Sequence, residues 1–169
     1  MNRNRIPLAT AGLLVTWMVH DLEELLTMGD TSRTLVQQLP DWIPVPGSIR
    51  EQSLTTRYLA TGIATIGLIV AAAAVRGYRT QGRSAFYQNT MLAFGLHELG
   101  HLAASLLTRG YTSGVATAPL VLLFWLLATQ ALEEARVPNR RSLPAAIALL
   151  AGCLAVGHST AYLLTGNQP

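Results

Sequence analysis

The chain has 169 residues, of which 50% are hydrophobic and 12% are charged, with a formal net charge of +3. Soluble domains usually carry about 25% charged residues, so this composition indicates a membrane protein that has the lipid bilayer as a partner. The positive charges are all arginines and are spread over the connecting segments, which argues against nucleic-acid binding. The single cysteine, Cys153, excludes an internal disulfide and a cysteine-based zinc site, so any metal must be bound through nitrogen and oxygen.

Five segments are apolar enough to be membrane-spanning helices, because a span needs about 20 mostly apolar residues. In chain order they cover approximately residues 6–28, 54–75, 85–108, 114–132 and 143–164. The sequence therefore predicts an all-α integral membrane bundle of five transmembrane helices, forming one domain over residues 1–169. Small residues in the second segment, Gly62, Gly67 and the run 71–74, are typical of close helix packing.

The arginines predict how the bundle is oriented, since Lys and Arg are enriched on the cytoplasmic side of a membrane. Eight of the twelve lie at the amino terminus and in the second-to-third and fourth-to-fifth connections. We therefore expect a cytoplasmic N-terminus and a C-terminus outside. The longest connection, residues 29–53, then lies outside, and its prolines and tryptophan in QLPDWIPVPGSI suit a lid at the membrane interface.

Seven histidine and glutamate side chains fall inside the predicted spans, where such a group costs about 2.5–3.5 kcal/mol at a helix centre. They are every histidine of the chain and three glutamates: His20, Glu23, Glu24, His97, Glu98, His101 and His158. One buried histidine is normally explained by a hydrogen bond, and one buried glutamate by a protonated, paired carboxyl group. Seven such groups together indicate a metal or proton-handling centre.

Helical spacing places these groups on shared helix faces. Side chains three and four residues apart share a helix face, which joins His20 to Glu23 and Glu24 on the first span. The same rule joins His97 to His101 on the third span. Counted from the cytoplasmic starts of their spans at about 1.5 Å per residue, the four histidines lie within about 6 Å of one level. We therefore predict one polar layer to which three helices contribute.

Metal binding is the preferred interpretation of this layer, because neutral imidazole and carboxylate are ligands for zinc, iron and manganese. A catalytic zinc takes three protein ligands, which would leave about half of the seven groups without a role. The count therefore favours two metal ions. Soluble di-iron bundles use Glu-x-x-His pairs, and Glu98 and His101 have this spacing. We expect Glu24 and Glu98 to be the catalytic carboxylates.

Two alternatives stay open. HELGH, residues 97–101, matches the H-E-x-x-H signature in which two histidines bind zinc and the glutamate activates water. It resembles the motif of intramembrane zinc proteases of the site-2 type, although the Asp-Gly dipeptide of those proteases does not occur in this chain. This zinc hydrolase interpretation also leaves His20, Glu23, Glu24 and His158 unused. The second alternative, a metal or proton transporter, is disfavoured by the nearly apolar inner halves of the helices.

Other polar residues in and near the spans have simpler expected roles. Arg57 extends to the lipid headgroups or, with Tyr58, orients a substrate. Gln88 and Asn89 form hydrogen bonds between helices. Asp21 faces away from the glutamates of its own helix and supports the site from behind.

The ordered set of motifs resembles a known family. His20 to Glu24 reads H-x-x-E-E, His97 to His101 reads H-x-x-x-H, and His158 follows in the last span. This pattern, which extends over nearly the whole chain, is similar to the HXXEE family of small bacterial integral-membrane proteins. The resemblance implies a multi-pass protein of the bacterial plasma membrane. The implied metal ligands are His20, Glu23, Glu24, His97, Glu98, His101 and His158.

The resemblance also implies a chemistry. Members that resemble oxidases of natural-product pathways, including those that handle nitrogen–nitrogen bonds, indicate a non-haem di-iron oxidase or oxygenase. On this hypothesis two metal ions, iron first and zinc or manganese as alternatives, use dioxygen to oxidise a small organic substrate. The apolar helix walls would exclude water from the reaction. A separate electron donor or partner oxidase is expected.

Overall fold

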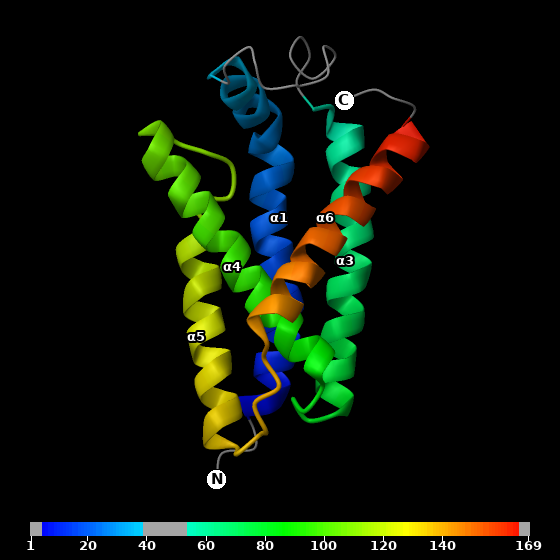
Figure 1. The fold of residues 1–169 in the computed structure, drawn as a ribbon, viewed down its shortest axis with the longest axis vertical. Coiled ribbons are helices and arrows are strands. Elements are labelled where there is room, and N and C mark those ends of the chain that lie inside the picture. Colours follow the sequence, from blue (N-terminus) through cyan, green and yellow to red (C-terminus); the bar gives the residue numbers. More distant parts are fainter. Residues whose placement is uncertain (1–4, 39–53, 166–169) are drawn as a thin grey trace.

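The fold is known from a computed structural model, which describes residues 5–38 and 54–165, with the backbone alone at 35–38. The described residues form five helices and no strand: α1 (Arg5–Gln38), α3 (Thr56–Arg79), α4 (Ala85–Thr108), α5 (Ala118–Glu134) and α6 (Leu143–Thr165). The all-α prediction is confirmed. Successive helices alternate in direction along the long axis, so α1 begins at one end and α6 finishes at the other (Figure 1).

The predicted helix limits hold to within four residues except at the end of the first, and residues 114–117, predicted as helix, belong to the connection before α5. α4 covers residues 85–108 as expected, whereas α1 continues to Gln38, ten residues beyond the predicted end at 28. The prediction that residues 29–53 form a loop is therefore wrong for its first part. The apolar stretch gives the length of a span but not the end of the helix, and no proline, which would interrupt a helix, occurs in the sequence between Pro7 and Pro40. The predicted lid sequence lies almost entirely outside the described residues.

Two of the helices, α3 and α6, are long and apolar enough to cross a membrane. The other three also carry large apolar side chains that point away from the bundle. Examples that are more than half exposed are Leu8 and Leu26 on α1, Leu106 on α4, and Leu123 and Leu127 on α5. A soluble protein seldom exposes such side chains on every helix, so this surface is suited to an apolar solvent.

Small residues let the helices approach closely. A Cβ atom on Gly67 would lie 2.5 Å from the Trp17 ring, and one on Gly62 would lie 3.5 Å from the carbonyl oxygen of Gly157. These contacts join α3 to α1 and to α6, and Ala73 beside them is fully buried. The predicted role of the small residues of α3 in helix packing agrees with these contacts.

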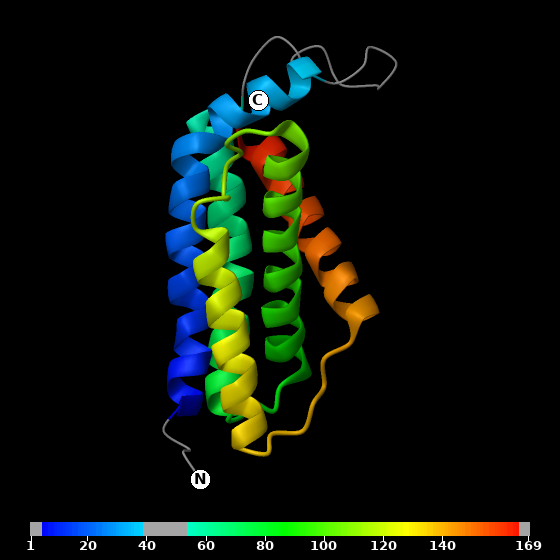
Figure 2. The same ribbon diagram turned by 90° about the vertical axis from the view of Figure 1, so that its left-hand side faces the viewer.

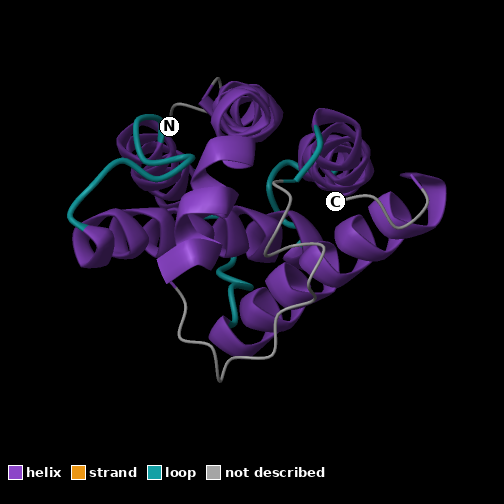
Figure 3. Cartoon of the chain, turned by 90° about the horizontal axis from the view of Figure 1, so that it is seen from above, coloured by secondary structure: helices purple, strands orange, loops and turns teal. Residues whose placement is uncertain are grey.

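Two polar residues of α4 hold the connection between α5 and α6, which runs along one end of the bundle (Figure 2). The Gln88 amide donates to Pro138 O at 3.0 Å, and its oxygen accepts from Arg140 N at 2.7 Å. Asn89 donates to Arg140 O and accepts from Ser142 N. The two side chains therefore bind the backbone of a connection instead of another helix side chain. Seen from above, some helices are viewed nearly along their axes and others run obliquely to them (Figure 3).

Candidate metal centre

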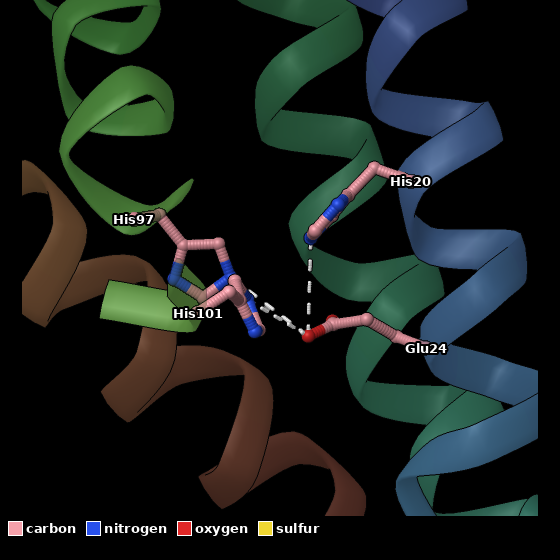
Figure 4. A group of neighbouring side chains, drawn as sticks. All are labelled: His20, Glu24, His97 and His101. Atoms are coloured by element: carbon pink, nitrogen blue, oxygen red, sulfur yellow. Dashed lines mark hydrogen bonds and ion pairs between the residues drawn. The ribbon is translucent and has the colours of Figure 1, made fainter. Parts of the chain in front are cut away.

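Four of the seven predicted side chains meet between α1 and α4. His20 and Glu24 come from α1, His97 and His101 come from α4, and one ligand atom of each lies within 4.8 Å of the others (Figure 4). Spacings of four residues within each helix point both pairs at the same place. The two helices lie on opposite sides of the group, whereas the polar layer predicted from the sequence also included the fifth span, which contributes no residue to it.

The distances within this metal-ligand group (His20, Glu24, His97 and His101) suit a single ion. His101 Nε2 lies 2.9 Å from His97 Nε2 and 3.2 Å from Glu24 Oε1. His20 Nε2 and His97 Nε2 each lie 3.9 Å from the same oxygen. Four ligands held about 2.0–2.1 Å from a tetrahedral ion would lie about 3.3–3.4 Å apart. The observed spread brackets that value.

Buried atoms without partners give an independent test of metal binding. His20 Nε2 and Glu24 Oε1 are buried and have no hydrogen-bond partner among the described residues. His20 is 1% exposed and Glu24 is 9% exposed. A buried polar atom without a partner is destabilising, and these two point into the group. A bound cation would satisfy both, so the residues fit a metal.

His20 is oriented through the other nitrogen of its ring. His20 Nδ1 lies 2.9 Å from Thr117 Oγ1 and 3.2 Å from Glu98 Oε2. With the proton on Nδ1, the lone pair of Nε2 faces the metal-ligand group. Metal-binding histidines are commonly held this way, by a carboxylate or hydroxyl on the far side of the ring.

Glu23 does not join the group and instead binds the connection between α4 and α5. Its Oε2 accepts hydrogen bonds from Thr117 N at 2.8 Å and from Thr117 Oγ1 at 2.6 Å. Its Oε1 accepts from Ala116 N at 3.1 Å and from the Tyr111 hydroxyl. Partial burial and the bond to Glu23 raise the pKa of the Tyr111 hydroxyl, which keeps that group a donor. Glu23 thus fixes the Thr117 hydroxyl, which in turn orients His20.

The connection between α4 and α5 passes directly against the ligands. Gly114 adopts φ +85°, and a Cβ atom there would lie 2.7 Å from His101 Nδ1 and 2.8 Å from His20 Cε1. Further bonds tie this segment to α1, including Ser113 Oγ to Thr27 Oγ1 at 2.8 Å. Only glycine meets both demands, a left-handed backbone and contact with two imidazoles.

Glu98 lies deep in the protein, beside His20 rather than among the ligand atoms of the group. It is 0% exposed, and neither of its oxygens has a hydrogen-bond partner among the described residues. Its Oε2 faces His20 Nδ1, on the side of the imidazole opposite the metal-ligand group. The structure therefore gives Glu98 the position of a group that orients a ligand.

A cavity of about 260 Å³ adjoins the metal-ligand group. Apolar side chains of α1, α3, α4 and α6 form most of its wall, among them Trp17, Ile63, Phe94 and Leu150. Glu24, His97 and His101 also reach it, so the group opens on the cavity.

His158 lies on the cavity wall but apart from the metal-ligand group. Its Nδ1 is 3.0 Å from the Tyr58 hydroxyl, which joins α6 to α3. Both residues line the cavity. The equal depth of the four histidines thus brings three of them together, while the fourth forms a separate Tyr58–His158 pair.

Asp21 also lines the cavity, although the sequence analysis has it facing away from the glutamates of α1. That expectation is wrong with respect to Glu24, because residues three apart share a helix face. Asp21 is 7% exposed. Thr117, Tyr111 and Gly114 were missed as well, since a nine-residue connection with no motif gives no signal in the sequence.

Comparison with family models matches residues 11–129 to a family described as a protein of unknown function with an HXXEE motif. Searches of curated proteins and of solved structures gave no significant match. The matched range covers more than half of the chain and contains all four residues of the metal-ligand group. The chain therefore belongs to the HXXEE family.

Proposed function

We propose that the protein is a membrane-embedded, metal-dependent oxidoreductase that acts on a small organic molecule bound in the cavity. The observation that carries this proposal is the opening of a convergent three-histidine, one-carboxylate group onto a mostly apolar cavity. Substrate sites are typically apolar cavities with a few converging polar groups. A redox-active ion such as iron in this group would supply activation of dioxygen.

Residues of the chain would hold the ion, orient its ligands and shield the reaction from water. His20, Glu24, His97 and His101 would hold the ion, and Thr117, Glu98 and Glu23 would keep His20 in the required orientation. The apolar wall would exclude water and exclude competing reactions. One ion would satisfy the close group of four, whereas the second ion predicted from the sequence would need ligands from Glu23, Glu98 or His158, which lie outside this group. An electron donor outside this chain would complete an oxygenase reaction.

An observation at Glu98 favours the oxidoreductase over a zinc hydrolase. In an H-E-x-x-H hydrolase the glutamate activates a water molecule beside the metal. Here Glu98 is fully buried beside His20 Nδ1 and is not among the residues that line the cavity. The cavity is also slightly below the usual range of about 300–1,000 Å³ for drug-sized ligands, which suits a small molecule better than a peptide.

The proposal includes a plasma-membrane location with five spans, the N-terminus in the cytoplasm and the C-terminus outside. The exposed leucines of α1, α4 and α5 support it, as do the arginines near the amino terminus, at and just after the end of α3, and in the α5–α6 connection. Fusion of alkaline phosphatase or green fluorescent protein to the C-terminus tests the orientation. Phosphatase activity without fluorescence is expected, and the reverse result would contradict the topology.

The decisive experiment is metal analysis of the protein purified in detergent, combined with Mössbauer spectroscopy and dioxygen consumption. Iron that disappears in His20→Ala supports the proposal, because an isolated H-E-x-x-H zinc site would not need His20. Stoichiometric zinc without iron would overturn the oxidoreductase. Dioxygen consumption on addition of a substrate must also disappear in His20→Ala.

A further inference from the structure

Asp21 places a second carboxylate on the cavity, beside the metal-ligand group. It is 7% exposed and borders the cavity from α1, one residue after His20. No hydrogen bond or ion pair joins it to another described residue. Four carboxylates gather around this centre, Asp21, Glu23, Glu24 and Glu98, and Asp21 alone is both on the cavity and outside the group of converging ligand atoms.

No described residue supplies a cation to this carboxylate. The sequence has no lysine, and no arginine is among the residues that line the cavity. Burial of an unpaired carboxylate in apolar surroundings is costly, whereas a charge-assisted hydrogen bond to a cation recovers much of that cost. The rest of the wall is apolar, apart from Thr90, Cys153, the Tyr58–His158 pair and the ligand group, and none of these brings a permanent positive charge.

We propose that the cavity binds a primary amine with an apolar body, whose ammonium group pairs with Asp21 beside the metal-ligand group. This inference deepens the proposed function and rests on it, because it names the substrate class of the same cavity. The ammonium supplies the hydrogen-bond donors that Asp21 lacks, and the apolar body fills the space between α3, α4 and α6. An alcohol or a carboxylic acid of the same length offers no matching charge.

Cys153 gives a direct readout of occupancy, because it is the single cysteine of the chain and it lines the cavity. The test is protection of Cys153 from methyl methanethiosulfonate in lipid nanodiscs, with n-octylamine, 1-octanol and octanoate as probes. We expect n-octylamine to protect at a concentration about tenfold or more below that of 1-octanol, since hydrogen bonds to charged groups stabilise by about 1.5–3 kcal/mol. Octanoate is expected not to protect.

Asp21→Asn should remove the preference for the amine while leaving protection by 1-octanol unchanged. Asp30→Asn is the matched control, because Asp30 lies on the same helix, is exposed and is not on the cavity. It should behave as the wild type does. Equal protection by amine and alcohol in the wild type would overturn the inference, and that comparison does not depend on how the variant folds.

Metal analysis of the same samples separates this inference from the proposed function. Loss of metal in Asp21→Asn but not in Asp30→Asn would make Asp21 a ligand and overturn its role in amine binding. Retained metal together with a preference for the amine that persists in Asp21→Asn would also overturn it. A wild-type protein that binds the amine but contains no metal would support the amine site and contradict the proposed oxidoreductase function.

Discussion

Glu23 and Glu24 are neighbours in the chain, yet their carboxylates bind different parts of the protein. Glu24 Oε1 lies 3.2 Å from His101 Nε2 of α4, whereas Glu23 Oε2 accepts a hydrogen bond from Thr117 N, 2.8 Å away in the next connection. Adjacent helix positions are about 100° apart around the axis, so one side chain turns to the metal-ligand group and the other to the connection beside it. The two glutamates of the family motif therefore have separate tasks.

Glu24→Gln and Glu23→Gln should differ in metal binding. Glu24→Gln removes a ligand, so the purified protein should contain almost no metal. Glu23→Gln weakens only the support of His20, and loss of such support typically lowers metal affinity about 10- to 100-fold. Chelator competition followed by elemental analysis measures both effects. Equal metal loss in the two variants would contradict the division of tasks.

His20→Ala and His158→Ala form a second matched pair. His20 Nε2 points into the metal-ligand group, whereas His158 is paired with Tyr58 across the cavity. We expect His20→Ala to lose the metal and His158→Ala to keep it at the wild-type ratio. Elemental analysis of both variants, purified in parallel, provides the measurement. Metal loss in His158→Ala would return this residue to the ligand set predicted from the sequence.

Gly114→Ala should weaken metal binding although it replaces none of the metal ligands. The left-handed backbone costs a non-glycine residue about 1–3 kcal/mol, and the added methyl group would collide with His101 and His20. Lower metal affinity and a lower Tm are expected. Gly152→Ala is the control, because no atom lies within 4 Å of a Cβ at that position. A Tm for Gly114→Ala equal to that of the control would refute this account.

Removal of the metal should lower the stability of the protein. An ion that binds only the folded state stabilises it by about 4 kcal/mol at a free concentration of about 1,000 times Kd. Chelator-treated protein should therefore show a lower Tm, which returns on addition of iron. Glu24→Gln should show the lower Tm from the start and no response to iron. If the Tm of the wild type does not change when the metal is removed, the result would argue against a metal centre.

Gly67→Ala tests the packing of the bundle separately from the metal. The new methyl group would lie 2.5 Å from the Trp17 ring, and overpacking of a core typically costs about 1–3 kcal/mol. We expect a lower Tm with the same metal content per folded chain. Thermal unfolding and elemental analysis on one preparation distinguish the two quantities. Metal loss in Gly67→Ala would show that the centre depends on this contact.

Much of the fold could be predicted because apolar length and helical spacing are local properties. The limits of α4 and the pairing of His97 with His101 follow from such local patterns. The division of labour between Glu23 and Glu24 does not, because it depends on a connection whose position is set by tertiary packing. The placement of His158 has the same cause: depth along the bundle can be counted from the sequence, whereas rotation of α6 about its own axis depends on packing against α3.

The hydrogen bonds between Glu23 and the connection before α5 have a consequence for biosynthesis. α1 leaves the ribosome first, with His20, Asp21, Glu23 and Glu24 already in place, and the atoms that satisfy three of them arrive only with α4 and Thr117. Until then the nascent helix carries a polar face whose insertion into a bilayer would be costly. These contacts of α1 can therefore form only after α4 and the connection that ends at Thr117, directly before α5, have been synthesised.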